Sequence, residues 1–370
     1  MLLALAALLG ASCCASALIL TGDEVYVISP TEPGPAALAF NDVLRDAYLV
    51  LGRRPLVLPA PPAPGAHPAN TTLSFFGTLD AAPWLPALFP SAPADCAGGW
   101  EAHCVLAGAV PGYASALLAT GSGMRGAMYG AYSFSEHVLG TNPLMHFTDD
   151  VPAYAAPLAV ADGLRLLFAP PRFKYRGLFI NDEDLLAEQF PDPLGLAAMD
   201  LRAYSRIIET LLRLKGNLLV PATNPYPDQQ VNALVGRRGA VLSMHHYDLV
   251  GGNVFSWPLP GTDWDWIRDP GSIAAMWRAS IDAQKDIPEV IWSVGLRGLN
   301  DEPYPCTLSK AACGAQISQA MGNQSAWIRA VQPCVWALAR AERQGGHDAL
   351  TRLSPARAPT PSTPPSGMLQ

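Results

Sequence analysis

The stretch Arg176–Asp184, with the sequence RGLFINDED, decides how the second half of the chain folds. Together with the preceding tyrosine, its apolar part forms the run Tyr175–Ile180. A short apolar run of this kind predicts a buried strand of a parallel sheet. Polar residues, Asn181 to Asp184, follow the run directly. A buried strand that ends in carboxylates is typical of folds whose reactive groups lie just beyond the strand ends.

The pattern of a strand followed by a helix recurs about four times after Pro170-Pro171. Apolar residues at helical spacing between Leu201 and Leu212 predict a helix that stops at Gly216. Asp269 as N-cap, followed by proline, opens another helix. Further strands are expected at Asn217–Pro221, Ala240–Met244 and Glu289–Leu296, and further helices at Gln229–Arg238 and along Trp327, Val331, Cys334, Val335 and Leu338.

This alternation predicts a partial (β/α)8 barrel of the TIM type over 172–345. Four strand–helix units are half of such a barrel, and a closed barrel takes about 250 residues. The sequence after Gly345 changes abruptly to a Pro-, Ser- and Thr-rich tail without periodicity. Such a composition cannot bury a core and predicts disorder. A tail at this place also suggests a truncated or misjoined gene model.

The segment before the two prolines predicts a small N-terminal α/β domain. Strands alternate with helices there, which implies layers of helix on sheet. The expected strands are Glu24–Ser29, Leu73–Gly77 and Cys104–Val110, and the expected helices cover 38–51 and 127–138, with Gly140 as C-cap. The run GSGMRG, Gly121–Gly126, is not a dinucleotide motif, because no convincing strand precedes it.

The start of the chain predicts a signal peptide. An apolar run ends in Ala15-Ser16-Ala17, which fits a cleavage site but is short for a membrane span. We therefore expect a secreted protein with no membrane contact after cleavage. The expected divisions of the chain are a signal peptide at 1–17, an α/β domain at 18–168, a partial barrel at 172–345 and a disordered tail at 346–370.

Charge and cysteine content narrow the function further. The formal net charge is −7 and no basic stripe is present, which argues against nucleic acid as a partner. No spacing of Cys and His suggests zinc, and no cofactor is expected. In an oxidising compartment two close pairs could each close a short loop. These pairs are Cys96 with Cys104 and Cys306 with Cys313, which leaves Cys334 unpaired.

Polar clusters follow the first and third expected barrel strands. Asp182 and Glu183 could protonate a leaving group, activate water or hold sugar hydroxyls, or they could form a solvated turn that caps the next helix. His245 and His246 could donate to sugar hydroxyls or shuttle a proton. Adjacent residues of an extended segment point to opposite faces, so we expect at most one histidine in the barrel mouth. The alternative is one packed and one exposed histidine.

A third cluster follows the fourth strand. Arg297 could hold a substrate carboxylate through two hydrogen bonds, and Asp301 or Glu302 could act as acid or base. The alternative is a structural pair between the arginine and an aspartate.

Aromatic residues precede the fourth strand. Aromatic faces stack on sugar rings, although a tryptophan is more often part of a core. The segment Asp263–Trp266 lies in the loop after the third strand, which makes a sugar contact credible. The tryptophans concerned are Trp257, Trp264, Trp266 and Trp277.

Several blocks in order resemble glycoside hydrolase family 115, the xylan α-1,2-glucuronidases. The blocks are RGLFINDED (Arg176–Asp184), LLRLKGNLLVPA (Leu211–Ala222), SMHH (Ser243–His246) and VGLRGLNDE (Val294–Glu302), preceded by MRGAMYGAYSFSEHVLGTNP (Met124–Pro143). The resemblance implies an α/β domain, a (β/α)8 barrel, and removal of glucuronic acid from xylan side chains by an inverting mechanism. It implies that the partner is a polysaccharide.

The resemblance also assigns roles to residues. Asp182, Asp301 and Glu302 are the catalytic candidates, with the two aspartates preferred. Glu183, His245, His246, Arg297 and Asn300 are the substrate-binding candidates. The family's fourth-strand motif is usually richer in Gly and Asp than Leu299-Asn300. Three hypotheses follow: a hydrolase whose native gene is longer, a non-catalytic sugar-binding remnant, and a fragment that does not fold.

Overall fold

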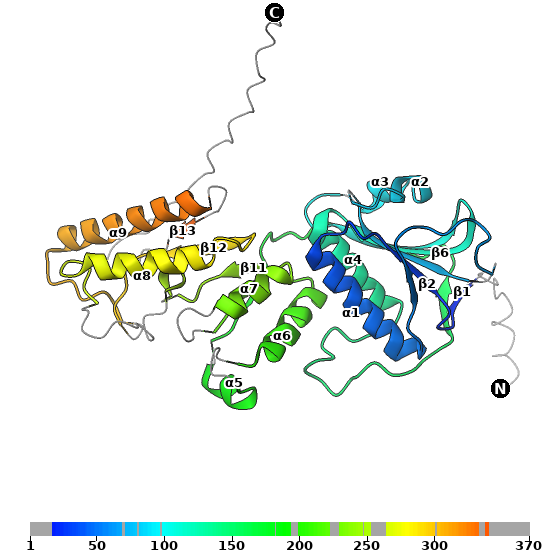
Figure 1. The fold of residues 1–370 in the computed structure, drawn as a ribbon, viewed down its shortest axis with the longest axis horizontal. Coiled ribbons are helices and arrows are strands. Elements are labelled where there is room, and N and C mark those ends of the chain that lie inside the picture. Colours follow the sequence, from blue (N-terminus) through cyan, green and yellow to red (C-terminus); the bar gives the residue numbers. More distant parts are fainter. Residues whose placement is uncertain are drawn as a thin grey trace, which may run out of the picture.

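The structure is a computed structural model, and it shows an α/β protein with two main sheets (Figure 1). Two ends that hold most of the predicted signal peptide and the whole predicted tail lie outside the described residues. The described residues are 17–68, 71–79, 81–96, 98–181, 183–193, 199–222, 229–246, 248–252, 264–299, 302–332 and 337–339.

The first sheet has six strands in the order β3-β2-β4-β6-β5-β8. The first four are parallel to one another, whereas β5 pairs antiparallel with both β6 and β8. A separate two-stranded sheet pairs β1 with β7. The strands are β1 (Ala17–Leu20), β2 (Val25–Ile28), β3 (Leu56–Leu58), β4 (Leu73–Thr78), β5 (His103–Val110), β6 (Tyr113–Gly121), β7 (Leu158–Ala161) and β8 (Arg165–Phe168).

Helices cover both faces of the six-stranded sheet. The long helices α1 (Gly34–Leu51) and α4 (Gly123–His137) pack on one face, and the short helices α2 (Leu85–Leu88) and α3 (Ala92–Cys96) pack on the other (Figure 1). The strands and helices expected from the sequence in this region are present. The prediction of Gly140 as C-cap is wrong: the C-cap of α4 is Val138, and Gly140 lies two residues further on, with a left-handed φ of +74°.

The glycine-rich run that follows β6 serves packing. The structure corrects the expectation that no strand precedes Gly121–Gly126, since β6 ends at Gly121 and α4 begins at Gly123. A Cβ on Gly126 would lie 2.7 Å from the carbonyl oxygen of Ala102, and one on Gly130 would lie 2.6 Å from that of Thr120. The glycines therefore allow α4 to approach the sheet closely.

The second sheet has five strands in the order β13-β12-β11-β10-β9, and every neighbouring pair is parallel. The strands follow one another in sequence, with helices between them. The elements are β9 (Gly177–Phe179), α5 (Glu183–Gln189), α6 (Leu201–Arg213), β10 (Leu218–Val220), α7 (Gln229–Arg237), β11 (Val241–Ser243), the 3-10 helix η1 (Leu249–Gly251), α8 (Pro270–Ala283), β12 (Val290–Val294), α9 (Lys310–Val331) and β13 (Ala337–Ala339).

The four strands expected here are present, but the last helix was placed wrongly. It begins at Lys310, with Ser309 as N-cap, and ends at Val331. Leu338, expected on that helix, lies in β13 and pairs with Ser293. The Gln332 amide explains the end of the helix, because it donates to carbonyl oxygens before β12 and accepts from the Trp292 indole. Cys334 lies outside the described residues.

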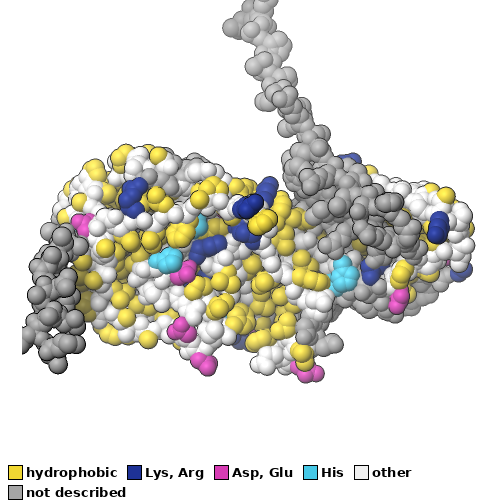
Figure 2. Space-filling view, turned by 180° about the vertical axis from the view of Figure 1, so that it is seen from behind, with side chains coloured by type: hydrophobic (Ala, Val, Ile, Leu, Met, Phe, Trp, Pro, Cys, Tyr) yellow, Lys and Arg dark blue, Asp and Glu magenta, His cyan; other side chains and the backbone are white. Residues whose placement is uncertain are grey.

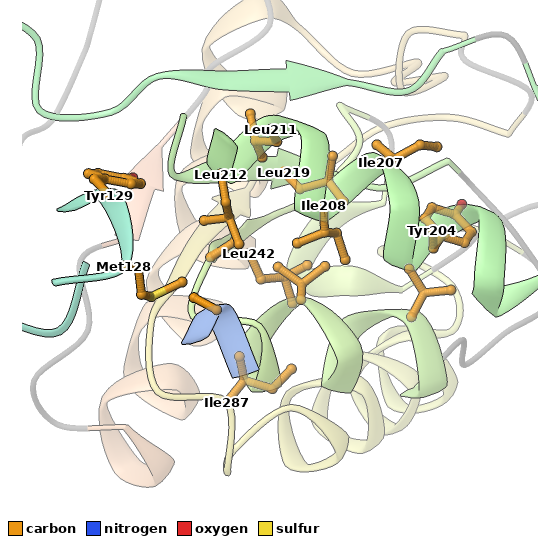
Figure 3. Close-up of a cluster of buried hydrophobic side chains, with 14 of the residues drawn as sticks. Met128, Tyr129, Tyr204, Ile207, Ile208, Leu211, Leu212, Leu219, Leu242 and Ile287 are labelled. Atoms are coloured by element: carbon orange, nitrogen blue, oxygen red, sulfur yellow. The ribbon is translucent and has the colours of Figure 1, made fainter. Parts of the chain in front are cut away.

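A common hydrophobic core joins the two sheets. Met128 and Tyr129 of α4 lie close to the apolar face of α6 and to strands β10 and β11 (Figure 3). The Tyr129 hydroxyl donates to the carbonyl oxygen of Gly216 at 2.8 Å. The labelled members of this core are Met128, Tyr129, Tyr204, Ile207, Ile208, Leu211, Leu212, Leu219, Leu242 and Ile287.

Buried ion pairs add to this contact at the amino ends of the parallel strands. Arg176, just before β9, and Asn217, just before β10, both donate to the buried carboxylate of Glu101. Arg125 of α4 donates to Glu101 and also to Glu289, just before β12. The first part of the chain is therefore attached at the amino edge of the second sheet, and the carboxyl edge faces away from it.

The surface carries both hydrophobic and charged side chains. Seen from behind, hydrophobic side chains are spread over much of one face, and Lys and Arg occur in small separate groups (Figure 2). Among the described residues no helix is both long enough and apolar enough to cross a bilayer.

Candidate functional site

The candidate site lies at the carboxyl edge of the five-stranded sheet. Parallel strands end at the same edge, so the residues that follow β9, β11 and β12 come close together. Asn181 follows β9, His245 and His246 follow β11, and Arg297 follows β12. The sequence predicted a polar site at these strand ends, and the described residues there do belong to one edge.

The rings of the two histidines contact each other in a tilted arrangement. Their ring centroids are 4.3 Å apart and their planes differ by 30°. His245 is only 2% exposed, and His246 is half-buried. The expectation that they point to opposite faces is wrong, because the two rings contact each other and both contact the Phe179 ring; β11 itself ends at Ser243, before the histidines.

Two residues at the carboxyl end of β9 contact the histidine pair. Nε2 of His245 lies 3.1 Å from Oδ1 of Asn181. Because an amide oxygen only accepts, this bond requires the imidazole proton to be on Nε2. The Phe179 ring lies 4.7 Å from the ring of His245 and 6.0 Å from that of His246, centroid to centroid. Asn181 and Phe179 therefore fix the orientation of the pair.

The sequence argument did not select Asn181 and Phe179 as site residues. Asn181 stands in the polar stretch after the strand, which was the available signal. Nothing local pointed to Phe179, because its role depends on contact with the histidines that follow β11, which are distant in sequence.

The loop after β12 forms a tight turn. The amide of Gly298 donates to the carbonyl oxygen of Glu302 at 2.9 Å, and the amide of Glu302 donates to that of Leu299 at 3.0 Å. Glu302 is exposed and Arg297 is partly exposed, so both side chains reach the surface near the strand end.

Several predicted site residues are not described. Asp182, Asn300 and Asp301 lie outside the described residues, and Glu183 is the first residue of α5 but its side chain is not described. The structure brings His245 and His246 together, and it shows Arg297 held through its carbonyl oxygen by the Trp264 indole at 2.6 Å.

The expected sugar platform is part of the core instead. Trp264 and Trp266 are 8% and 5% exposed, and both pack on Trp277, which is fully buried. Both indoles contact Trp277 of α8, so they pack the loop before α8 against that helix. Trp257 and Asp263 lie outside the described residues.

The cysteine pairs are as expected. Cys96 is bonded to Cys104 and Cys306 to Cys313, so each disulfide closes a short loop. Within the described part of the chain, no cluster of His, Cys, Asp and Glu has the arrangement of a metal site.

The segment of the chain that contains the second sheet matches a known protein family. Residues 169–340 match the sequence profile of glycosyl hydrolase family 115. A search of curated proteins gives no significant match.

The chain is similar to the solved structure of a family 115 4-O-methyl-α-glucuronidase, described as specific for decorated arabinogalactans. The identity is 20% and the TM-score is 0.69, over 85% of this chain and 41% of that protein. The chain thus spans less than half the length of that relative. Two structures of mutant Streptomyces plicatus β-hexosaminidase with the product GlcNAc have TM-scores of 0.45 and 0.46. They are 12% and 11% identical and cover 88% of this chain and 63% of theirs.

Proposed function

We propose that this chain is part of a glycoside hydrolase that removes glucuronic acid from the side chains of a xylan-type polysaccharide. The observation that carries the proposal is the match of 169–340 to family 115, the segment that contains the histidine pair and Arg297. The polar groups at one sheet edge support it, since reactive groups in parallel α/β enzymes lie at the carboxyl ends of the strands.

We propose that β9 to β13 are the first strands of a (β/α)8 barrel. All five are parallel and adjacent in sequence order, as the wall of such a barrel requires. Each strand is followed by helical sequence on its way to the next. The barrel mouth is then the carboxyl edge, opposite the attachment of the first part of the chain.

The proposed reaction is hydrolysis with inversion. An acid protonates the leaving oxygen while a base activates water on the other side of the sugar, with carboxyl groups about 6.5–9.5 Å apart. Asp182 and Asp301 are the preferred acid and base, with Glu302 as a further candidate. His245 is held in one orientation by Asn181, so His246, whose ring contacts that of His245, can present a fixed donor to a sugar hydroxyl.

A second candidate function is sugar binding without catalysis. Leu299-Asn300 departs from the family's fourth-strand pattern, and Leu299 is 45% exposed at the strand end. A binding protein needs the donors that orient a sugar but no pair of carboxylates at a set distance.

One assay separates the two functions. The full chain is incubated with glucuronoxylan oligosaccharides and, because the relative in family 115 acts on them, with decorated arabinogalactan oligosaccharides. Release of free glucuronic acid supports the hydrolase, and NMR of the first product formed gives its anomeric configuration. Affinity by calorimetry without release supports the binding protein. Absence of both release and affinity contradicts both proposals.

We propose that the protein is secreted after cleavage behind Ala17. Two disulfides support an oxidising compartment. Sequencing of the amino terminus of protein recovered from the culture medium tests this, and a mature protein beginning at Leu18 is expected.

A further inference from the structure

The loop that joins β12 to α9 is anchored at both ends. At its start, the Gln324 amide donates to the carbonyl oxygen of Gly295 at 2.8 Å and accepts from the Gly295 amide at 2.8 Å. Gln324 is fully buried in α9. At the end of the loop, Cys306 is bonded to Cys313 in the first turn of α9. Both ends are therefore fixed to the same helix.

The same loop is also held in its middle by the neighbouring loop before α8. The Trp264 indole donates to the carbonyl oxygen of Arg297 at 2.6 Å, and the Tyr304 hydroxyl donates to Oδ1 of Asp265 at 3.2 Å. Trp264 and Tyr304 are 8% and 4% exposed, so water does not compete freely for these bonds. Two adjacent loops at the carboxyl edge are thus joined at two points.

Trp264 and Asp265, the two residues of the loop before α8 that bind the arginine loop, are themselves held by further contacts. The Trp264 ring packs edge-on against Trp277, with centroids 6.3 Å apart. The Asp265 carboxylate also accepts from the amides of Ile267 and Arg268, which ends the loop in a defined turn. The anchors are therefore attached to the core through α8.

The backbone next to Arg297 has little room to adjust. A Cβ on Gly298 would lie 2.5 Å from the carbonyl oxygen of Pro303, which shows how closely the two sides of the loop approach. An arginine that grips a carboxylate with two hydrogen bonds needs its guanidinium at a fixed angle. Because Trp264 holds the carbonyl group of Arg297 itself, it limits the directions in which that side chain can leave the backbone.

We infer that Trp264 and Tyr304 are positioning residues that hold Arg297 for the carboxylate of a uronic acid and so determine the preference for a uronic over a neutral sugar. This inference rests on the proposed function. It concerns residues that do not touch the substrate and act through the backbone of the arginine loop.

The test measures the ratio of kcat/KM for an α-glucuronoside to that for the matching α-glucoside. Trp264→Phe removes the indole donor and keeps an aromatic ring, and Tyr304→Phe removes only the hydroxyl. We expect each to lower the ratio about tenfold, with KM for the glucuronoside rising more than kcat falls. Trp266→Phe is the matched control, because Trp266 packs on the same Trp277, and it should leave the ratio unchanged.

The outcomes separate this inference from the proposed function. A wild-type chain that releases glucuronic acid, with an unchanged ratio in both Trp264→Phe and Tyr304→Phe, overturns the positioning role alone. An equal fall in Trp266→Phe also overturns it, because loss of packing then explains the effect. A wild-type chain that neither cleaves nor binds glucuronic acid removes the proposed function and this role with it. If Trp264→Phe does not fold, Tyr304→Phe decides.

Discussion

Arg176 donates a hydrogen bond of 2.5 Å to Glu101, although 75 residues of sequence separate them. Glu101 is 4% exposed, and its backbone has a φ of 57°, which residues other than glycine rarely adopt. Its carboxylate also accepts from Arg125 at 2.6 Å and from Asn217 at 3.0 Å. A strained backbone persists where its surroundings fix it, so this network holds Glu101 in place.

Removal of the Glu101 carboxylate should destabilise the protein strongly. Glu101→Ala leaves the buried Arg125 and the half-buried Arg176 without their shared partner, which costs about 3–5 kcal/mol of unfolding free energy. Urea unfolding followed by circular dichroism measures this. The control is Asp23→Ala, which breaks an exposed pair with Arg53 and should cost under about 1 kcal/mol. If both variants lost the same unfolding free energy, the buried network would stabilise the protein no more than an exposed ion pair does.

Stability should fall in mild acid because of His103. Burial, together with the nearby charges of Lys215 and Arg176, lowers the pKa of His103 to about 4. The unfolded chain, with an ordinary pKa near 6.5, binds the proton first, so stability is lost as pH falls from about 6.5 to about 4. In this range His103 makes the unfolding free energy change by up to about 1.4 kcal/mol per pH unit.

The His103→Gln variant isolates this effect, since glutamine can still donate to the carbonyl oxygen of Glu101. Unfolding free energies of both proteins are measured between pH 4 and 7. The difference between wild type and variant should grow with pH across this window. A difference that stays constant would show that His103 does not titrate there.

Two glycine substitutions should have opposite effects. Gly130→Ala places a Cβ against the β6 backbone, 2.6 Å from the carbonyl oxygen of Thr120, and should cost more than about 2 kcal/mol. Gly322→Ala, on the open side of α9 with no atom within 4 Å of the new Cβ, should stabilise by about 0.5–1 kcal/mol. Thermal unfolding of both variants checks the prediction, which fails if both shift the midpoint in the same direction.

Arg297→Leu should weaken binding of glucuronic acid more than binding of glucose, because it removes a carboxylate partner. Calorimetry with both sugars gives the two affinities, and the loss for the uronic acid should be at least about tenfold. An equal loss for both sugars would make Arg297 a structural residue.

Asp301→Asn should abolish hydrolysis while the melting temperature stays within a few degrees, as expected of a group at a strand end. Release of glucuronic acid and thermal unfolding are measured on the same preparation. The conservative Glu302→Gln variant serves as comparison. Unchanged turnover in Asp301→Asn would remove it from the catalytic candidates.

The strands of the second sheet could be predicted because each is a short apolar run with polar residues after it. The error at Leu338 has a physical cause: apolar residues three or four apart fit a helix, and short runs do not distinguish helix from strand. The strand Tyr113–Gly121 was missed because it consists largely of small residues with no alternating pattern. Its burial depends on α4, which the local sequence does not reveal.

The strand edge at which the candidate residues lie could be predicted, but their contacts could not. Strand ends identify His245, His246 and Arg297 as neighbours, since parallel strands share an edge. The bond from His245 to Asn181 joins residues 64 apart, and no local pattern encodes it. Trp264 was assigned to sugar because tryptophan composition does not show which ring faces are covered.

The position of Arg125 has a consequence for how such proteins can change during evolution. Its guanidinium contacts Glu101 in its own half, and Gly239 and Glu289 in the other. A substitution on one side of this junction alters the partners on the other. The two halves are therefore expected to be inherited together, and a chimera that joins the first half of one relative to the second half of another should fail unless all these partners match.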